Sequence, residues 1–109
     1  MYHDITSFKA YQKAIEQNDA VLFYFSHQQC NVCKVLKPKI AELMAEEFPK
    51  IKLFYCDTVL SPDIAVQNNV FAVPTILIFF GGKELIRKSR NMGIDELWGL
   101  IERLYGLMF

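Results

Sequence analysis

This chain has few cysteines, no net charge and no long apolar run. Each of these absences argues against a class of protein. The 109 residues include three cysteines, an odd number that fits poorly with the paired disulfides of a small secreted domain. Lys and Arg together number 12, as do Asp and Glu, so neither a nucleic acid nor a membrane surface is an expected partner. No apolar run approaches the length of about 18 residues that a membrane span needs.

The N-terminal residues Met1–Asp4 also lack the charged and then apolar pattern of a signal peptide. A reducing cytoplasm is therefore the expected location, with the alternative that a signal was removed from a longer precursor. Apolar and aromatic residues are plentiful, at 52% and 14% of the chain. This composition and this length predict a single domain over residues 1–109 with a substantial core.

Hydrophobic periodicity predicts that helices and strands alternate along the chain. Helices are expected to begin at Thr6 or Ser7, Asn31, Ser61 and Ile94, and strands to cover 20–25, 51–56, 75–80 and 83–89. We expect the Ser61 hydroxyl to cap its helix, Gly81-Gly82 to form a hairpin turn and Gly106 to end the last helix. This order predicts an α/β fold in which a mixed central sheet of four to five strands is flanked by about four helices.

The sequence Cys30-Asn31-Val32-Cys33 lies between the apolar strand at 20–25 and the second helix. Apolar residues in that helix recur every three or four positions, which is typical of a face packed on a core. They are Val32, Leu36, Ile40, Leu43, Met44 and Phe48. A strand, a short polar loop and a helix place Cys30 at the helix N-terminus, with Cys33 one turn deeper on nearly the same face.

A cysteine at a helix N-terminus is well placed for thiol chemistry. Unpaired N–H groups and the helix dipole stabilise the thiolate there and lower the pKa of the thiol. A second thiol one turn away can attack any mixed disulfide that the first one forms. We therefore expect Cys30 to be the exposed nucleophile and Cys33 the more buried resolving thiol of a thiol–disulfide oxidoreductase.

These motifs resemble the thioredoxin family over nearly the whole chain. The resemblance rests on Cys30 and Cys33, Lys34, Pro38, Val73-Pro74-Thr75 and the terminal amphipathic helix. It implies a thioredoxin-like three-layer sandwich in which Pro74 follows a cis peptide bond and faces the cysteine pair. It also implies that the backbone of Val73 contacts bound substrate.

The same resemblance implies which partners the chain has. These are disulfide-containing protein substrates and an upstream thiol reductant. No bound cofactor is expected beyond the redox-active disulfide between Cys30 and Cys33, and a monomer is favoured.

The sequence also departs from the usual pattern of that family. Gln29 stands where thioredoxins have a tryptophan before the first cysteine, and Asn31-Val32 replaces Gly-Pro between the two cysteines. Tyr24 aligns with the buried aspartate that accepts a proton from the resolving thiol, and Arg90 falls near a glycine of the substrate groove. We therefore expect the flat apolar docking surface and the proton relay of the family to be missing.

Other readings of these residues remain open. His27 and Lys34 would favour a Cys30 thiolate by their positive charge, although a solvated loop histidine and a surface lysine are the ordinary cases. A Cys-x-x-Cys pair is also half of a zinc site, but the other half is missing because only Cys56 and the two histidines remain, so no metal is expected. Cys56 itself is expected to be an inert core thiol. A redox-inert docking domain is the other alternative.

Overall fold

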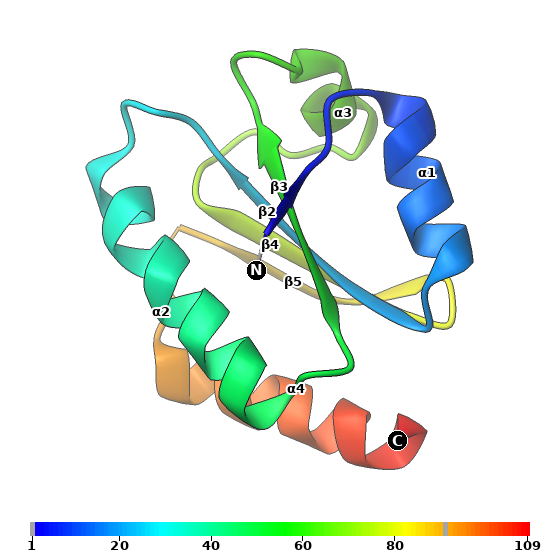
Figure 1. Ribbon diagram of the computed structural model, residues 1–109. Helices are drawn as coiled ribbons and strands as arrows, with labels where there is room; N and C mark the ends of the chain where they lie inside the picture. The colour runs from blue at the N-terminus through cyan, green and yellow to red at the C-terminus, as the bar shows by residue number, and fades with distance from the viewer. Residues whose placement is uncertain (1, 91) are drawn as a thin grey trace.

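A computed structural model describes residues 2–90 and 92–109, in which a five-stranded mixed sheet lies between two layers of helices (Figure 1). Along the chain the elements are β1 (His3–Asp4), α1 (Phe8–Gln17), β2 (Ala20–Ser26), α2 (Asn31–Glu47), β3 (Lys52–Asp57), α3 (Pro62–Gln67), β4 (Thr75–Phe80), β5 (Lys83–Ser89) and α4 (Ile94–Met108). The α/β fold class expected from the sequence is confirmed. Within the described residues, no helix combines the length and the apolar character that crossing a membrane requires.

The strands lie in the order β1-β3-β2-β4-β5. β3 runs parallel to both β1 and β2, whereas β4 is antiparallel to both β2 and β5. Parallel neighbours need long crossover connections, which the helices provide. The β4–β5 hairpin needs only the Gly81-Gly82 turn, whose φ angles of 60° and 83° suit glycine.

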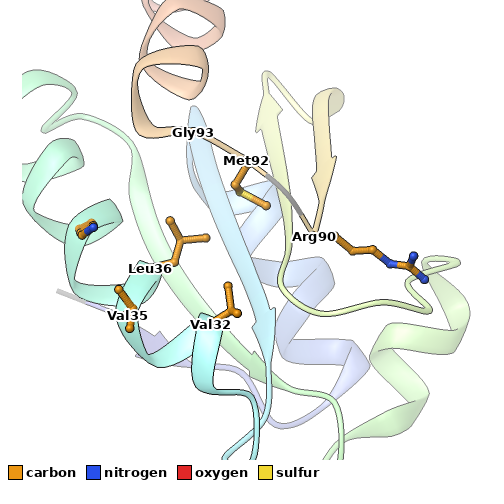
Figure 2. Close-up of a pocket in the computed structure, with 7 residues that line it drawn as sticks. Val32, Val35, Leu36, Arg90, Met92 and Gly93 are labelled. Atoms are coloured by element: carbon orange, nitrogen blue, oxygen red, sulfur yellow. The ribbon is translucent and has the colours of Figure 1, made fainter.

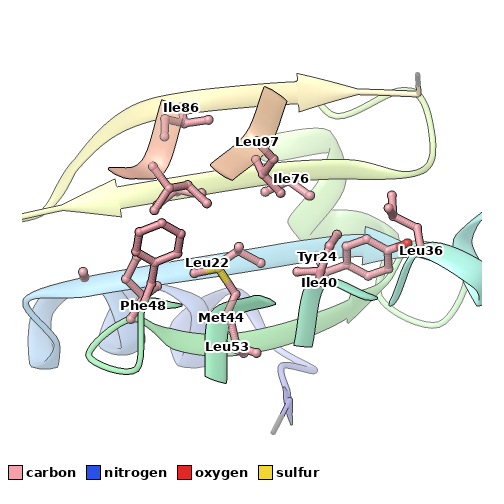
Figure 3. Packing of buried hydrophobic residues seen from close by; sticks show 14 of the residues in the cluster. Leu22, Tyr24, Leu36, Ile40, Met44, Phe48, Leu53, Ile76, Ile86 and Leu97 are labelled. Atoms are coloured by element: carbon pink, nitrogen blue, oxygen red, sulfur yellow. The ribbon is translucent and has the colours of Figure 1, made fainter. Parts of the chain in front are cut away.

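β2 lies at the centre of the sheet and is buried along its whole length. Its side chains alternate between the two faces. Leu22 and Tyr24 pack with residues of α2 and α4 in the core drawn in Figure 3, whereas Phe23 and Phe25 pack with residues of α1 and α3. Because both faces of β2 are covered, the segment reads as a continuous apolar run rather than an alternating one.

Four strand ends that position the site meet at one edge of the sheet. Ser26, at the end of β2, pairs with Asp57, at the end of β3. Phe25 and Ser89 both pair with Thr75, the first residue of β4. The loop after β2, the loop after β3, the segment before β4 and the segment after β5 therefore border the same edge.

The expected end of the last helix is wrong, because α4 does not stop at Gly106 but continues to Met108. Aromatic packing accounts for the extra turn. The ring of Tyr105 lies 5.1 Å from that of Phe48 and 4.9 Å from that of Phe109. These contacts offset the low helix propensity of glycine.

Three smaller expectations also need correction. The Ser61 hydroxyl does not cap α3, because it is turned toward the segment after β1 and donates to the Thr6 carbonyl oxygen at 3.3 Å. Val32 is 64% exposed, and Cys33 is the first residue of α2 that enters the core. β1 is not predicted by any pattern in the sequence, since a strand of two exposed residues has no hydrophobic period to detect.

Candidate active site

Cys30 and Cys33 form a disulfide across the first turn of α2, with their Cα atoms 5.2 Å apart. Cys30 is the N-cap residue of the helix, and its Sγ accepts a hydrogen bond from the Cys33 backbone N–H at 3.2 Å. The Cys30 carbonyl oxygen accepts from the Lys34 N–H, also at 3.2 Å, which begins the helical hydrogen bonding. A sulfur thus takes the place that a serine or aspartate oxygen usually has at a helix start.

The two sulfur-bearing residues differ in their access to solvent. Cys33 is 1% exposed and belongs to the core beneath α2, whereas Cys30 is half-buried at its margin. A partner that approaches from solvent therefore meets Cys30 first. This is the asymmetry that the sequence predicted for the pair.

Tyr24 lies on β2, with its side chain fully buried beneath the first turn of α2. Its hydroxyl donates a hydrogen bond to the Cys33 carbonyl oxygen at 2.9 Å. Burial, with a smaller effect of the neighbouring Tyr55, raises the pKa of the Tyr24 phenol well above its ordinary value. The group at this position is therefore a neutral hydrogen-bond donor, not a proton acceptor.

The loop before Cys30 is held by its own backbone and by His27. The His27 carbonyl oxygen accepts from the Cys30 N–H at 3.3 Å, and His27 Nδ1 accepts from the Gln29 N–H at 3.2 Å. An Nδ1 that accepts a hydrogen bond carries no proton, so in this arrangement the ring shapes the loop. Lys34 is exposed on the helix directly after Cys33.

The Val73–Pro74 peptide bond is cis, and Pro74 is buried at the edge where the strand ends meet. The Pro74 carbonyl oxygen accepts from the Arg90 N–H at 2.7 Å. The Thr75 hydroxyl donates to the Ala72 carbonyl oxygen at 2.6 Å. These two bonds connect the segment before β4 to the residue after β5 and stabilise the turn before Thr75. Val73 precedes β4 and does not belong to the strand ladder.

A groove of about 580 Å³ opens next to the cysteine pair, between α2 and the segment that leads into α4. Figure 2 shows Val32, Leu36 and Met92 around this space. The residues that line it are Val32, Val35, Leu36, Lys39, Arg90, Met92 and Gly93. An apolar surface is thus present beside the cysteines, contrary to expectation, and it includes Arg90, which falls near a glycine of the family's substrate groove. The four α2 residues, at i, i+3, i+4 and i+7, share one face of the helix, but their spacing does not indicate that Arg90, Met92 and Gly93 lie opposite them.

Cys56, the third cysteine, is free and buried on the other side of the sheet, among residues of α1 and α3. Burial, with a smaller effect of Asp4, raises the pKa of its thiol to about 12. The expectation of a core thiol is confirmed.

Comparison with known proteins adds three findings from sequence. The family model described as Thioredoxin matches residues 3–103. The chain is 30% identical to the thioredoxin-like protein YdfQ of Bacillus subtilis, over 85% of this chain and 82% of that protein. It is 34% identical to thioredoxin-1 of Saccharomyces cerevisiae, over 76% of this chain and 82% of that protein.

Solved structures agree with these sequence matches. Oxidized mitochondrial thioredoxin 3 of Saccharomyces cerevisiae superposes with a TM-score of 0.75 at 28% identity, covering 80% of this chain and 81% of that one. Thioredoxin 1 of Thermosipho africanus superposes with a TM-score of 0.74 at 32% identity, covering 80% of this chain and 96% of that one.

Proposed function

Because this chain belongs to the thioredoxin family and is a thiol–disulfide oxidoreductase, we propose that it reduces disulfide bonds in other proteins through Cys30 and Cys33. In the reduced chain, the Cys30 thiolate attacks one sulfur of the substrate disulfide and releases the other as a thiol. The Cys33 thiolate then attacks Cys30 Sγ, which releases the second substrate thiol and forms the Cys30–Cys33 disulfide. Two electrons pass to the substrate, and an upstream thiol reductant restores the dithiol.

The observation that carries this proposal is the asymmetry of the pair at the N-terminus of α2. Cys30 Sγ has a backbone N–H donor at 3.2 Å and a half-buried position, while Cys33 is closed off in the core. A donor and the positive end of the helix dipole both favour a thiolate on Cys30. Cys30 is therefore assigned as nucleophile and Cys33 as resolving thiol.

Val73 and Pro74 are proposed to receive the substrate backbone next to the disulfide. The support is their place directly before β4, where the amide and carbonyl groups of Val73 lie outside the β4 ladder. Lys34 is proposed to favour the thiolate further by its charge. His27 is proposed as a second such candidate in its protonated form, in which Nδ1 no longer accepts from the Gln29 N–H.

The proposed setting is the reducing cytoplasm, where a thiol reductant can regenerate the dithiol. We further propose that the chain acts as a monomer and as one domain over residues 1–109. A free and buried third cysteine is in keeping with a reducing compartment.

The test is a trapping experiment with the Cys33→Ser variant. After reduction and mixing with a disulfide-bonded protein, this variant is expected to accumulate a mixed disulfide through Cys30, because no resolving thiol is present. The matched Cys30→Ser variant is expected to trap far less, since Cys33 is buried. Equal trapping by the two variants would reverse the assigned roles, and no trapping by either would favour the redox-inert docking domain instead.

A further inference from the structure

The charges of α2 run against the direction that a helix dipole favours. Lys34, Lys37 and Lys39 lie in the half that begins at the cysteines, whereas the acidic residues all lie in the other half: Glu42, Glu46 and Glu47. Helices normally carry acids in the first turn and bases in the last. α4 follows that rule, with Asp95 and Glu96 in its first turn. The reversed order in α2 therefore concentrates positive charge at the end that carries the disulfide.

Arg90 adds a further positive charge at the same edge. Its φ angle of 62° is in the left-handed region, which disfavours residues with a side chain other than asparagine or aspartate. The bond from its N–H to the Pro74 carbonyl oxygen fixes this conformation. Strained backbone conformations are found most often at functional sites. Arg90 lines the groove, and Figure 2 shows its guanidinium extending away from Val32 and Met92.

In the part of the chain that the structure describes, none of these cations forms an ion pair, although Lys39 lines a separate hollow with Glu42 and Glu46. The two ion pairs found there join Arg87 to Glu84 and Lys88 to Glu96. The groove lining itself contains two cations, Lys39 and Arg90, together with apolar residues and no acid. Lys37 is occupied elsewhere, with its Nζ 3.7 Å from the centroid of the Tyr55 ring.

We propose that this chain selects disulfides whose flanking segment combines an apolar side chain with acidic residues. The apolar side chain enters the groove beside Val32, which is 64% exposed, and Val35, which is 59% exposed. The carboxylates face Lys39 and Arg90, which both line the groove. This inference rests on the proposed reduction of protein disulfides and leaves its chemistry unchanged, since it concerns only which segments dock.

The experiment compares two disulfide-bridged peptides that share one leucine next to a cysteine and differ only in flanking residues, glutamate in one and lysine in the other. The reduced chain is expected to react with the glutamate peptide at least about tenfold faster at low ionic strength, because charge complementarity raises association rates. The difference should shrink as salt screens the charges. Rates are followed by the appearance of peptide thiols.

Charge-reversal variants locate the effect. The Lys39→Glu/Arg90→Glu variant is expected to lose or invert the preference for the glutamate peptide, and the single Lys39→Glu change to reduce it. The matched control is Lys9→Glu/Lys13→Glu, which makes the same change of net charge on exposed residues of α1, across the sheet from the groove. This control is expected to keep the preference.

Each result decides between the two proposals. Equal rates for both peptides with the unmodified chain would overturn the inference and leave the proposed function standing. Failure to reduce either peptide would overturn the proposed function itself. Equal loss of preference in the α1 control would assign the effect to net charge and not to the groove.

Discussion

Tyr24 connects the central strand to the reactive turn through a single hydrogen bond. Its hydroxyl is 2.9 Å from the Cys33 carbonyl oxygen and is shielded from water by the core around it. A buried donor that loses its acceptor, or an acceptor that loses its donor, costs more free energy than an exposed one. The stability of the first turn of α2 therefore depends on this phenol.

The Tyr24→Phe variant is expected to lower the free energy of unfolding by about 1 kcal/mol, the usual contribution of one such hydrogen bond. Chemical denaturation of the oxidised protein measures it. Tyr11→Phe is the matched comparison, because the Tyr11 hydroxyl donates to Asn68 Oδ1 at 3.0 Å on the other face of the sheet. An unchanged stability for Tyr24→Phe would show that the bond to Cys33 contributes nothing.

The Cys33 thiol has no proton acceptor at the position of Tyr24. Because burial raises the pKa of the Tyr24 phenol, that group stays neutral at neutral pH and cannot take the thiol proton. Release of substrate from a preformed mixed disulfide on Cys30 should therefore be slow near pH 7 and should accelerate as the pH rises. Rapid release that does not vary with pH, or an NMR titration in which Cys33 ionises before Cys30, would contradict the assigned roles.

At the level of strands and helices, two glycines lie in different backbone conformations, so replacing them with alanine is expected to change stability in opposite directions. Gly82, in the β4–β5 turn, has a φ angle of 83°, while Gly106 lies inside α4 with open space where a Cβ would be. A side chain at Gly82 is strained by the backbone alone. A side chain at Gly106 only reduces the freedom of the unfolded chain.

Gly82→Ala is therefore expected to lower the free energy of unfolding by about 1–2 kcal/mol. Gly106→Ala is expected to raise it by about 0.5–1 kcal/mol. Thermal or denaturant unfolding of both variants gives the comparison. Two changes of the same sign would mean that the turn or the end of α4 differs from the conformation described.

The elements that could be predicted from sequence are those whose signal is local. The run at 20–25, the polar loop and the periodic segment after Asn31 are contiguous, so the position of Cys30 at a helix start was predictable. β1 could not be predicted, because its two residues are placed only by pairing with Phe54 and Tyr55. The exposure of Val32 could not be predicted either, because helical spacing alone does not tell whether Val32 or the adjacent Cys33 faces the sheet.

The groove could not be predicted from sequence patterns, because its two sides come from distant parts of the chain. Met92 and Gly93 are far in sequence from Val35 and Lys39, and only the sheet order brings them together. By contrast, the segment Val73–Thr75 was identified through a family resemblance and not through any physical pattern.

At the scale of the whole molecule, burial of ionisable groups makes stability depend on pH in the alkaline range. Burial raises the pKa of the Cys56 thiol to about 12, above the value of about 8.5 for an unfolded thiol. The unfolded chain therefore loses this proton first, and the associated stability, fully present below about pH 8.5, is lost as the pH rises toward 12. The phenols of Tyr2, Tyr11 and Tyr24, whose pKa values are also raised by burial, act in the same direction.

The free energy of unfolding of the oxidised protein should accordingly fall between about pH 8.5 and 12. In the Cys56→Ala variant, stability starts lower because of the cavity left in the core, but its decline with pH should be shallower. Urea titrations over that range measure both slopes. Identical slopes would mean that the Cys56 thiol ionises as easily in the folded chain as in the unfolded one.

Thiol balance in a single turnover distinguishes a disulfide reductase from a redox-inert domain. The reduced chain is mixed with a disulfide-bonded protein, the reaction is stopped with an alkylating reagent, and mass spectrometry locates every free thiol in both proteins. We expect Cys30 and Cys33 to lose their thiols together, Cys56 to keep its own, and the substrate to gain two thiols for each chain oxidised. Free thiols that persist on Cys30 and Cys33 while the substrate disulfide stays intact would contradict this expectation.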